Sequence, residues 1–210
     1  MEDFFQIDPD VCIFSAHKFM GSLTAGIVAG KKKYIRNIYL QNLGIGRGMK
    51  VGKEGIYASI AAVENWYKKN WNKEFNNQNK ILKYWINFLN KKNYQGITYE
   101  IIADPTGNKI NRLRIIIDKK IAKFSPQSLS YFLEKNNPSI YVRDDLIHKG
   151  HFELDTCNLK LNQEKVVMLE MNKIINKLKQ KKLKHKITQS EYKKRTMQTW
   201  FLWPDNISRN

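Results

Sequence analysis

Cysteine is scarce in this sequence, and no set of metal-binding residues stands out. Cys12 and Cys157 lie far apart, without the Cys-x-x-Cys spacing of redox or zinc motifs. The cysteines therefore support neither a disulfide framework nor a zinc site, and a reducing, cytoplasmic environment is expected. His148 and His151 form a pair on a Lys-Gly turn without the further ligands of a zinc site, so we expect no bound metal.

Long apolar runs are absent as well. No stretch of about 18 apolar residues occurs, so we expect no membrane-spanning helix. The first residues show neither the basic leader nor the small-residue cleavage site of a signal peptide, and none is expected. Hydrophobic residues still make up 42% of the 210 residues, which is enough for one large or two small folded domains.

Acidic residues are few: 19 Asp and Glu stand against 37 Lys and Arg, which gives a net charge of +18. A surface that binds nucleic acid would account for this charge, since basic side chains displace counterions from phosphates. A compositional bias also accounts for it, because Lys, Asn and Ile are frequent along the whole chain. We favour the bias, since phosphate-binding surfaces use Arg forks and this chain relies on Lys. Nucleic acid stays an alternative partner.

The positive charge is densest over residues 177–195, where Glu191 is the only acid. Such a stretch is typical of a solvated helix face, and contact with an anionic partner is the alternative. Residues 181–210 thus form a basic tail. Its aromatic residues at 200–203 are expected to dock on another surface, because so much aromatic area seldom stays in water.

Apolar and turn-forming segments alternate in a way that predicts an α/β protein. In the first part, the expected elements in chain order are strands over 11–14 and 25–30, a helix over 31–40, a glycine-rich loop over 44–52, a helix from residue 53 and a helix over 74–89. The helix from residue 53 carries Ile56, Ile60, Val63 and Tyr67 at helical spacing, and these residues form its apolar face.

After a boundary near residue 93, the pattern predicts a compact α+β unit. Its expected elements are strands over 97–103 and 109–118, a helix from 125, strands over 139–143 and 152–154 and a helix from 162. Ser125 suits the cap of the first helix and Pro126 its first position. We therefore divide the chain into residues 1–93, 94–180 and the tail 181–210.

Residues 10–21 (DVCIFSAHKFMG) combine a short apolar strand with a polar loop that contains Lys18. A lysine that forms a Schiff base must be held at a fixed point and partly desolvated, so that its amine is neutral often enough to attack a carbonyl. A hydroxyl such as that of Ser15 could bind a phosphate beside it. From spacing alone, an ordinary solvated loop lysine is the favoured interpretation, because many loops contain a Ser-x-His-Lys pattern.

Several segments resemble the fold-type I pyridoxal-phosphate enzymes, in the branch that contains D-glucosaminate-6-phosphate ammonia-lyase and selenocysteine synthase (seryl-tRNA selenium transferase). They are the Ser-x-x-Lys of residues 15–18, residues 24–31 (TAGIVAGK), 44–56 (GIGRGMKVGKEGI) and 138–143 (PSIYVR), and Leu154-Asp155. The resemblance runs from about residue 8 to 175. It implies that residues 1–93 are the C-terminal part of the large cofactor domain and that 94–180 are the small domain.

The resemblance also implies roles for single residues. Lys18 would hold pyridoxal 5'-phosphate covalently and move protons on the substrate, Ser15 would bind the cofactor phosphate, and His17 would lie beside the cofactor. Arg47 and Lys50 would bind a phosphate of the small-molecule substrate or of the cofactor of a neighbouring subunit.

Each of these roles has a plainer alternative. The alternatives are a strand-end cap for Ser15, a loop histidine bonded to the backbone for His17, and a subunit-contact loop for Arg47 and Lys50.

Arg143, which the resemblance assigns to a substrate carboxylate, could instead pair with a neighbouring acid. Asp144 and Asp145 follow it directly in the sequence. Since an Arg fork suits any carboxylate, both interpretations stand at this point.

For the whole chain, the resemblance implies a lyase that removes ammonia or water from an amino acid or an amino sugar acid phosphate. In the family, about half the chain precedes the lysine and supplies much of the cofactor site. We therefore expect a truncated or split member, working as a homodimer or with a partner chain that supplies the upstream half. The alternatives are a non-catalytic fragment and a tRNA-dependent transferase like selenocysteine synthase.

Overall fold

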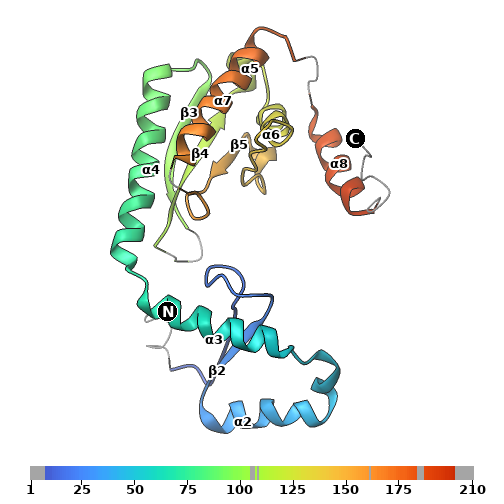
Figure 1. Ribbon diagram of the computed structural model, residues 1–210. Helices are drawn as coiled ribbons and strands as arrows, with labels where there is room; N and C mark the ends of the chain where they lie inside the picture. The colour runs from blue at the N-terminus through green and yellow to red at the C-terminus, as the bar shows by residue number, and fades with distance from the viewer. Residues whose placement is uncertain (1–7, 105–106, 108, 161, 184–186, 202–210) are drawn as a thin grey trace. The chain divides into compact units, whose positions relative to one another are not determined.

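The structure is a computed structural model that describes residues 8–104, 107, 109–160, 162–183 and 187–201. The chain divides between Asn70 and Trp71 into two compact units (Figure 1). Both contain helices and a small antiparallel sheet, so the predicted α/β composition is confirmed.

The described part of the first unit is a β-hairpin followed by helices. Its elements are strands β1 (Val11–Ser15) and β2 (Gly26–Gly30), helix α2 (Lys32–Leu40), the 3-10 helices η1 (Gln41–Leu43) and η2 (Ile45–Met49), and helix α3 (Lys53–Lys68). The two strands and the two helices predicted in this part are confirmed. The glycine-rich segment predicted as a loop contains the two short 3-10 turns.

The two strands pair in a fixed register, with Ile13 opposite Val28. Gly30 ends β2 with φ +154°, and a Cβ at this position would lie 2.3 Å from the carbonyl oxygen of Asp10. Only glycine fits both the backbone angle and the close approach. The glycine therefore allows the chain to leave the hairpin and begin α2.

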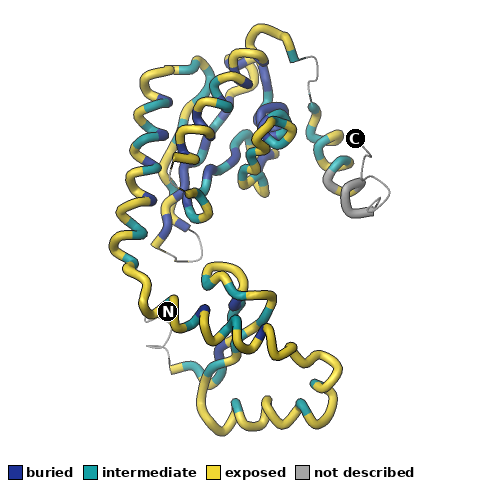
Figure 2. The backbone as a smooth tube through the Cα atoms, in the orientation of Figure 1, coloured by how far each residue is buried: buried dark blue, intermediate teal, exposed yellow. Residues whose placement is uncertain are grey.

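Helix α3 packs through small residues, not through the apolar face that its sequence predicts (Figure 2). Its buried residues are Gly55 and Ala62, whereas Ile56, Ile60 and Tyr67 are 42%, 52% and 76% exposed. Small side chains let the helix come close to the hairpin. Val63, the fourth residue of the predicted face, is half-buried, so most but not all of that face is exposed.

The second unit is built on a three-stranded antiparallel sheet in the order β3-β4-β5. Its elements in chain order are α4 (Trp71–Lys92), β3 (Ile97–Ala103), β4 (Asn111–Ile117), α5 (Lys119–Ala122), α6 (Pro126–Glu134), η3 (Ile147–Lys149), β5 (His151–Leu154), α7 (Gln163–Lys179) and α8 (Gln189–Phe201). Helices α4, α6 and α7 pack with the sheet around one core.

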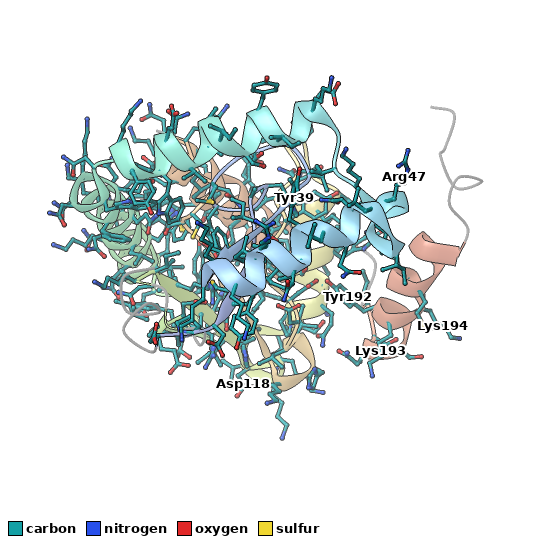
Figure 3. The ribbon with its side chains drawn as sticks, turned by 90° about the horizontal axis from the view of Figure 1, so that it is seen from below. Tyr39, Arg47, Asp118, Tyr192, Lys193 and Lys194 are labelled. Carbon is teal, nitrogen blue, oxygen red and sulfur yellow. The ribbon has the colours of Figure 1, made fainter. Side chains whose placement is uncertain are left out.

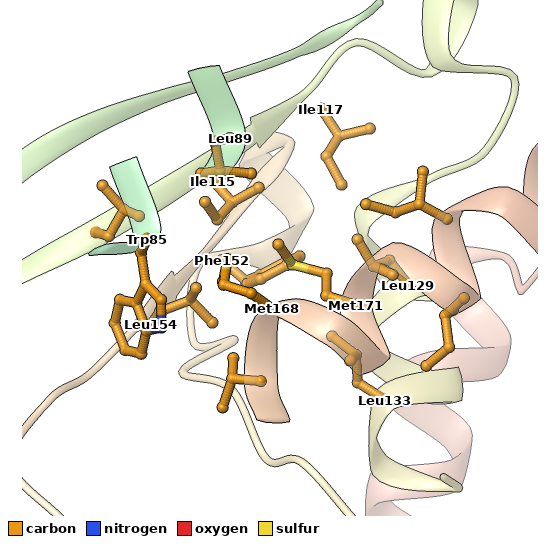
Figure 4. Packing of buried hydrophobic residues seen from close by; sticks show 14 of the residues in the cluster. Trp85, Leu89, Ile115, Ile117, Leu129, Leu133, Phe152, Leu154, Met168 and Met171 are labelled. Carbon is orange, nitrogen blue, oxygen red and sulfur yellow. The ribbon is translucent and has the colours of Figure 1, made fainter. Parts of the chain in front are cut away.

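Alternate residues of β4 point into this core (Figure 4). Leu113, Ile115 and Ile117 are buried, as the period of two in a strand requires. Trp85 of α4 is 1% exposed, and its indole N–H donates to the carbonyl oxygen of Glu164 at 3.1 Å. The one polar atom of this large side chain is therefore satisfied, and its burial carries no unpaired donor.

The division between the units falls earlier than the predicted boundary near residue 93. The structure groups α4, which the sequence predicts over 74–89, with the second unit. The reason lies in its apolar stripe, since Leu82, Trp85 and Leu89 are all buried in that unit's core.

The start of α6 agrees with the sequence. Ser125 caps the helix by accepting a hydrogen bond from the backbone N–H of Ser128 at 3.2 Å, and Pro126 is its first residue. Residues 139–143, predicted as a strand, do not form one: only Arg143 pairs, in a single bridge with Glu153. The N–H of Ile140 is donated to the carbonyl oxygen of Leu133 at the C-terminal end of α6, at 2.9 Å.

Helix α8 lies within the predicted basic tail. Of the aromatic residues at 200–203, the structure describes only the helical backbone of Trp200 and Phe201. The predicted docking of these side chains therefore falls outside the described residues.

We expect Leu129→Ala to destabilise the second unit by about 2–5 kcal/mol, because a fully buried side chain leaves a cavity when it is removed. Ile121→Ala serves as the control, since Ile121 is 56% exposed and its loss should cost less than about 0.5 kcal/mol. Urea unfolding followed by tryptophan fluorescence measures both. Equal midpoints for the two variants would contradict this packing.

Candidate functional site

The loop that carries Lys18 connects β1 to β2 and is closed at its base by backbone hydrogen bonds. The N–H of Ala16 donates to the carbonyl oxygen of Ala25 at 3.0 Å, and the N–H of Ser22 donates to that of Ala16 at 3.0 Å. Ala16 has no exposed surface. The N–H of Gly21 donates to the carbonyl oxygen of Lys18 at 3.3 Å, which forms a tight turn starting at the lysine. Lys18 thus stands two residues from a buried anchor.

The side chains proposed for the cofactor differ in exposure. Ser15, the last residue of β1, is partly buried, whereas His17 and Lys18 are exposed. The His17 Nδ1 lies 3.5 Å from the carbonyl oxygen of Ala25, so the predicted backbone partner is present at the limit of hydrogen bonding. The described residues of the first unit do not desolvate the amine of Lys18, and the partial desolvation expected of a Schiff-base lysine would have to come from elsewhere.

Helix α3 contacts the part of this loop that returns to β2. The hydroxyl of Ser59 donates to the carbonyl oxygen of Gly55 at 2.7 Å, so its proton is already used. The hydroxyl of Ser22, 3.3 Å from that of Ser59, is then the donor between the two. The helix and the loop are in van der Waals contact at Gly55, where a Cβ would lie 3.9 Å from the carbonyl oxygen of Thr24. The return arm of the Lys18 loop is therefore fixed by α3.

Arg47 and Lys50 lie on η2 and on the residue that ends it. Both are exposed, and Figure 3 shows Arg47 projecting away from the ribbon. Among the described residues, neither side chain makes an ion pair or hydrogen bond, and no such contact links them to Lys18. The structure thus leaves both cations available to an anion, and it does not join them directly to the lysine.

Arg143 belongs to the second unit and faces three carboxylates. Its nearest distances are 3.6 Å to Asp145, 3.9 Å to Glu153 and 3.9 Å to Asp155, and its side chain is 46% exposed. The alternative pairing with Asp145 is therefore present. A role in binding a substrate carboxylate stays a prediction.

A buried ion network around Arg112 escaped the sequence reasoning. Arg112 contacts Asp104 at 2.5 Å and Asp155 at 2.8 Å, and its side chain is only 6% exposed. Burial alone would raise the pKa of Asp155, but hydrogen bonds from Cys157 and Arg112 outweigh it and hold this pKa below its usual value. The available signal was the alternation of β4, which places Arg112 and Arg114 on the face opposite the core.

A hollow of about 540 Å³ lies between α6, η3 and α8 in the second unit. Glu134, Asp144 and Asp145 line it together with Tyr192, and Arg195 pairs with Glu134. Burial raises the pKa of Asp144, and the charges of Asp145 and Glu134 raise it further. Lys193 and Arg195 also line the hollow, so its charge is mixed and does not by itself indicate a ligand.

The search for other kinds of site covers the described residues alone. Within them, no three His, Cys, Asp or Glu side chains gather as metal ligands would, and His148 is exposed on η3 while His151 begins β5. Of the helices in the described ranges, none is long and apolar enough to cross a membrane.

We expect Asp155→Asn to lower stability at pH 7 by about 1.5–3 kcal/mol, the contribution of a hydrogen bond to a charged group. Because the folded pKa of Asp155 lies below its unfolded value of about 3.9, the stabilisation is present above that pH and is lost as the pH falls through the folded pKa. The difference in stability between the wild type and Asp155→Asn should therefore decrease at acid pH. Denaturant unfolding at a series of pH values measures it. Asp145→Asn is the control, since its side chain is 77% exposed; an identical effect in both variants would refute the assignment.

Ser59→Ala should loosen the Lys18 loop, because Ser22 loses its partner on α3. Loss of a hydrogen bond worth about 0.5–1.5 kcal/mol should speed amide exchange at Ser22 by about 2- to 12-fold. Hydrogen exchange read by NMR or mass spectrometry checks this. Ser59→Thr keeps the hydroxyl and should restore slow exchange; equal rates in the alanine and threonine variants would count against the contact.

Comparison with known proteins gives no matching family model. Over 166 residues, 79% of this chain, the sequence is 27% identical to a 5'-C-glycyluridine monooxygenase-decarboxylase from a Streptomyces species. Over 167 residues, again 79% of the chain, it is 24% identical to the D-glucosaminate-6-phosphate ammonia lyase of Salmonella typhimurium. These alignments cover 41% and 43% of the two relatives, so the chain spans less than half of their length.

A solved structure of a D-glucosaminate-6-phosphate ammonia-lyase matches with a TM-score of 0.62 and 23% identity, covering 80% of this chain and 44% of that one. The predicted resemblance to the ammonia-lyase branch is thus confirmed by sequence and by fold. Over about four fifths of its length, this chain is a homologue of the Salmonella ammonia lyase and has the fold of part of an ammonia-lyase.

Proposed function

We propose that this chain is the lysine-bearing part of a pyridoxal-phosphate-dependent lyase. The observation that carries the proposal is Lys18, whose amine is presented on a hydrogen-bonded turn after β1 in a chain homologous to an ammonia lyase. The buried anchor at Ala16 holds this turn at a fixed point, as covalent attachment of a cofactor requires.

The residues around Lys18 fit the attachment of the cofactor but not its enclosure. The amine is accessible to an aldehyde, and the hydroxyl of Ser15 lies at the adjoining strand end, where it would bind the cofactor phosphate. His17 would pack beside the ring. The exposure of Lys18 means that further walls must come from outside the described residues of the first unit, and a second copy or a partner that supplies the upstream half would provide them.

When bound, pyridoxal phosphate supplies an electron sink, and the protein supplies position and proton transfer. Lys18 would take the proton from the carbon that bears the substrate amine and, once the hydroxyl of the neighbouring carbon has left as water, would return a proton to that neighbouring carbon. Hydrolysis by water would then release the nitrogen as ammonia. The Lys18 amine must be neutral for the first of these steps. The walls that complete the site would therefore have to desolvate Lys18, because desolvation disfavours the ammonium form.

The substrate would be an amino acid or an amino sugar acid phosphate that loses ammonia. The name of the Salmonella relative supports this class. Arg47 and Lys50 support it as well, since two exposed cations on a glycine-rich segment before α3 suit an anionic group. Arg143 would bind the substrate carboxylate and would give up its contacts with Asp145, Glu153 and Asp155 to do so.

Reduction with borohydride tests the attachment. The full chain is co-expressed with the part of the Salmonella lyase that the alignment leaves unmatched, incubated with pyridoxal phosphate, reduced and mapped by peptide mass spectrometry. Lys18 should carry most of the label, with a new absorbance band near the visible edge, and Lys18→Ala should remove both.

Lys32→Ala is the matched control, because Lys32 is another exposed lysine of the first unit. It should leave the labelling unchanged. Label spread evenly over the surface lysines, or an equal loss in both variants, would overturn the assignment of Lys18.

A further inference from the structure

The turn between α4 and β3 gathers three lysine-bearing segments at one end of the second unit. The hydroxyl of Tyr94 in this turn donates to the side-chain oxygen of Asn172 on α7 at 2.6 Å, and its ring lies 5.5 Å from the amine of Lys179. On its other side, the N–H of Asp118 donates to the carbonyl oxygen of Gly96 at 2.9 Å. The C-terminal ends of α4 and α7 therefore lie at the same end of this unit as α5 (Figure 1).

The contact between this turn and α5 is closer than a side chain would allow. Gly96 has φ +78°, and a Cβ at this position would lie 2.5 Å from the backbone nitrogen of Ala122. Only glycine fits both the backbone angle and the close approach. The backbone therefore fixes where α5 stands relative to the end of α4, whatever their lysine side chains do.

These three segments carry eight exposed lysines, which we call the basic pole. They are Lys91, Lys92, Lys119, Lys120, Lys123, Lys179, Lys181 and Lys182. Within residues 91–96, 118–123 and 179–183 the only acid is Asp118, and its carboxylate caps α5 by accepting the N–H of Lys120 at 2.8 Å. None of the eight amines makes an ion pair with a described residue. The pole is therefore a concentration of unneutralised positive charge.

A compositional bias explains the number of lysines but not their separation from acids. Elsewhere in the same unit, Arg112, Arg114 and Lys173 are each paired with carboxylates. The helix dipole favours lysines at the ends of α4 and α7, but it disfavours Lys119 and Lys120 at the start of α5. Since like charges held together repel, a bound polyanion would relieve a repulsion that the folded chain otherwise carries.

We propose that the basic pole binds the phosphate backbone of a nucleic acid. Ammonium groups spread over three segments suit a chain of phosphates, because each phosphate that a lysine neutralises releases counterions. The segments of the pole contain no arginine, whose fork would read a base edge. Binding should therefore be independent of base sequence.

An anionic membrane suits the pole less well. Peripheral helices bind lipid by inserting a broad apolar face beside their cations. Among the described side chains of the three segments, Ile121 is the one large apolar residue that is mostly exposed, at 56%. One such side chain between lysines offers no face to insert.

Salt-dependent binding to nucleic acid tests the proposal on the full chain, without any cofactor. The chain is titrated by fluorescence anisotropy against a labelled RNA hairpin and a labelled DNA duplex of equal length. The variant Lys91→Gln/Lys119→Gln/Lys120→Gln/Lys182→Gln should bind at least about 10-fold more weakly at low salt. The slope of log K against log salt should become shallower by about 3–4, since each lost phosphate contact removes about 0.9.

The matched control is Lys80→Gln/Lys83→Gln/Lys149→Gln/Lys160→Gln, which removes the same charge from exposed lysines elsewhere in the second unit. It should weaken binding less than about 3-fold, because these lysines lie outside the pole. Equal losses in the two variants would show that net charge alone attracts the probe, and this result would overturn the proposal.

Chemical labelling of lysine amines in the wild-type chain gives a second measurement, which does not depend on the folding of a variant. The amines of the pole should be protected when either probe binds, whereas those of Lys80 and Lys83 should not. Protection of the pole by either probe supports the proposal, and the tighter probe distinguishes RNA from DNA. Absence of binding to both probes at low salt, or tighter binding to phosphatidylserine vesicles than to either probe, would refute it.

Discussion

The backbone pairing at the base of the β1–β2 loop is the constraint on which the candidate site depends. Ala16 is tied to Ala25 and to Ser22, and it has no exposed surface. This anchor keeps its place only while Ile13 stays opposite Val28, because a slip of one residue would turn every side chain of the strand to the other face. The position of Lys18 is therefore a consequence of strand register and needs no contact of its own side chain.

The two units differ in where their stability comes from. In the second unit, strand residues at alternate positions and the stripes of three helices meet in one core. In the first unit, α3 gives its small residues to the hairpin and leaves Ile56 and Ile60 outside. The exposed apolar side chains and the exposed Lys18 thus both belong to the unit that buries few residues.

Much of this could be predicted from the sequence, because local patterns determine local structure. The strand before Lys18 follows from its apolar run and the start of α6 from Ser125 and Pro126. Periodicity identifies an apolar face but not what covers it, and so it failed to anticipate that α3 packs through Gly55 and Ala62.

Contacts between distant segments could not be predicted from the sequence, for the same reason. The ion network of Arg112 joins Asp104 on one side and Asp155 on the other, residues that no local pattern brings together. Residues 139–143 look like a strand, yet only Arg143 pairs with β5, and Ile140 is bonded to the end of α6 instead.

The cationic side chains discussed above differ in whether they are already paired with carboxylates. Arg112 and Arg143 in the second unit are held by carboxylates, and a ligand that recruits Arg143 must compete with acids at 3.6–3.9 Å. Arg47 and Lys50 have no such competition among the described residues, so binding an anion there breaks no existing pair. An anion therefore meets less competition at the η2 segment than at Arg143, where it must first take the place of Asp145.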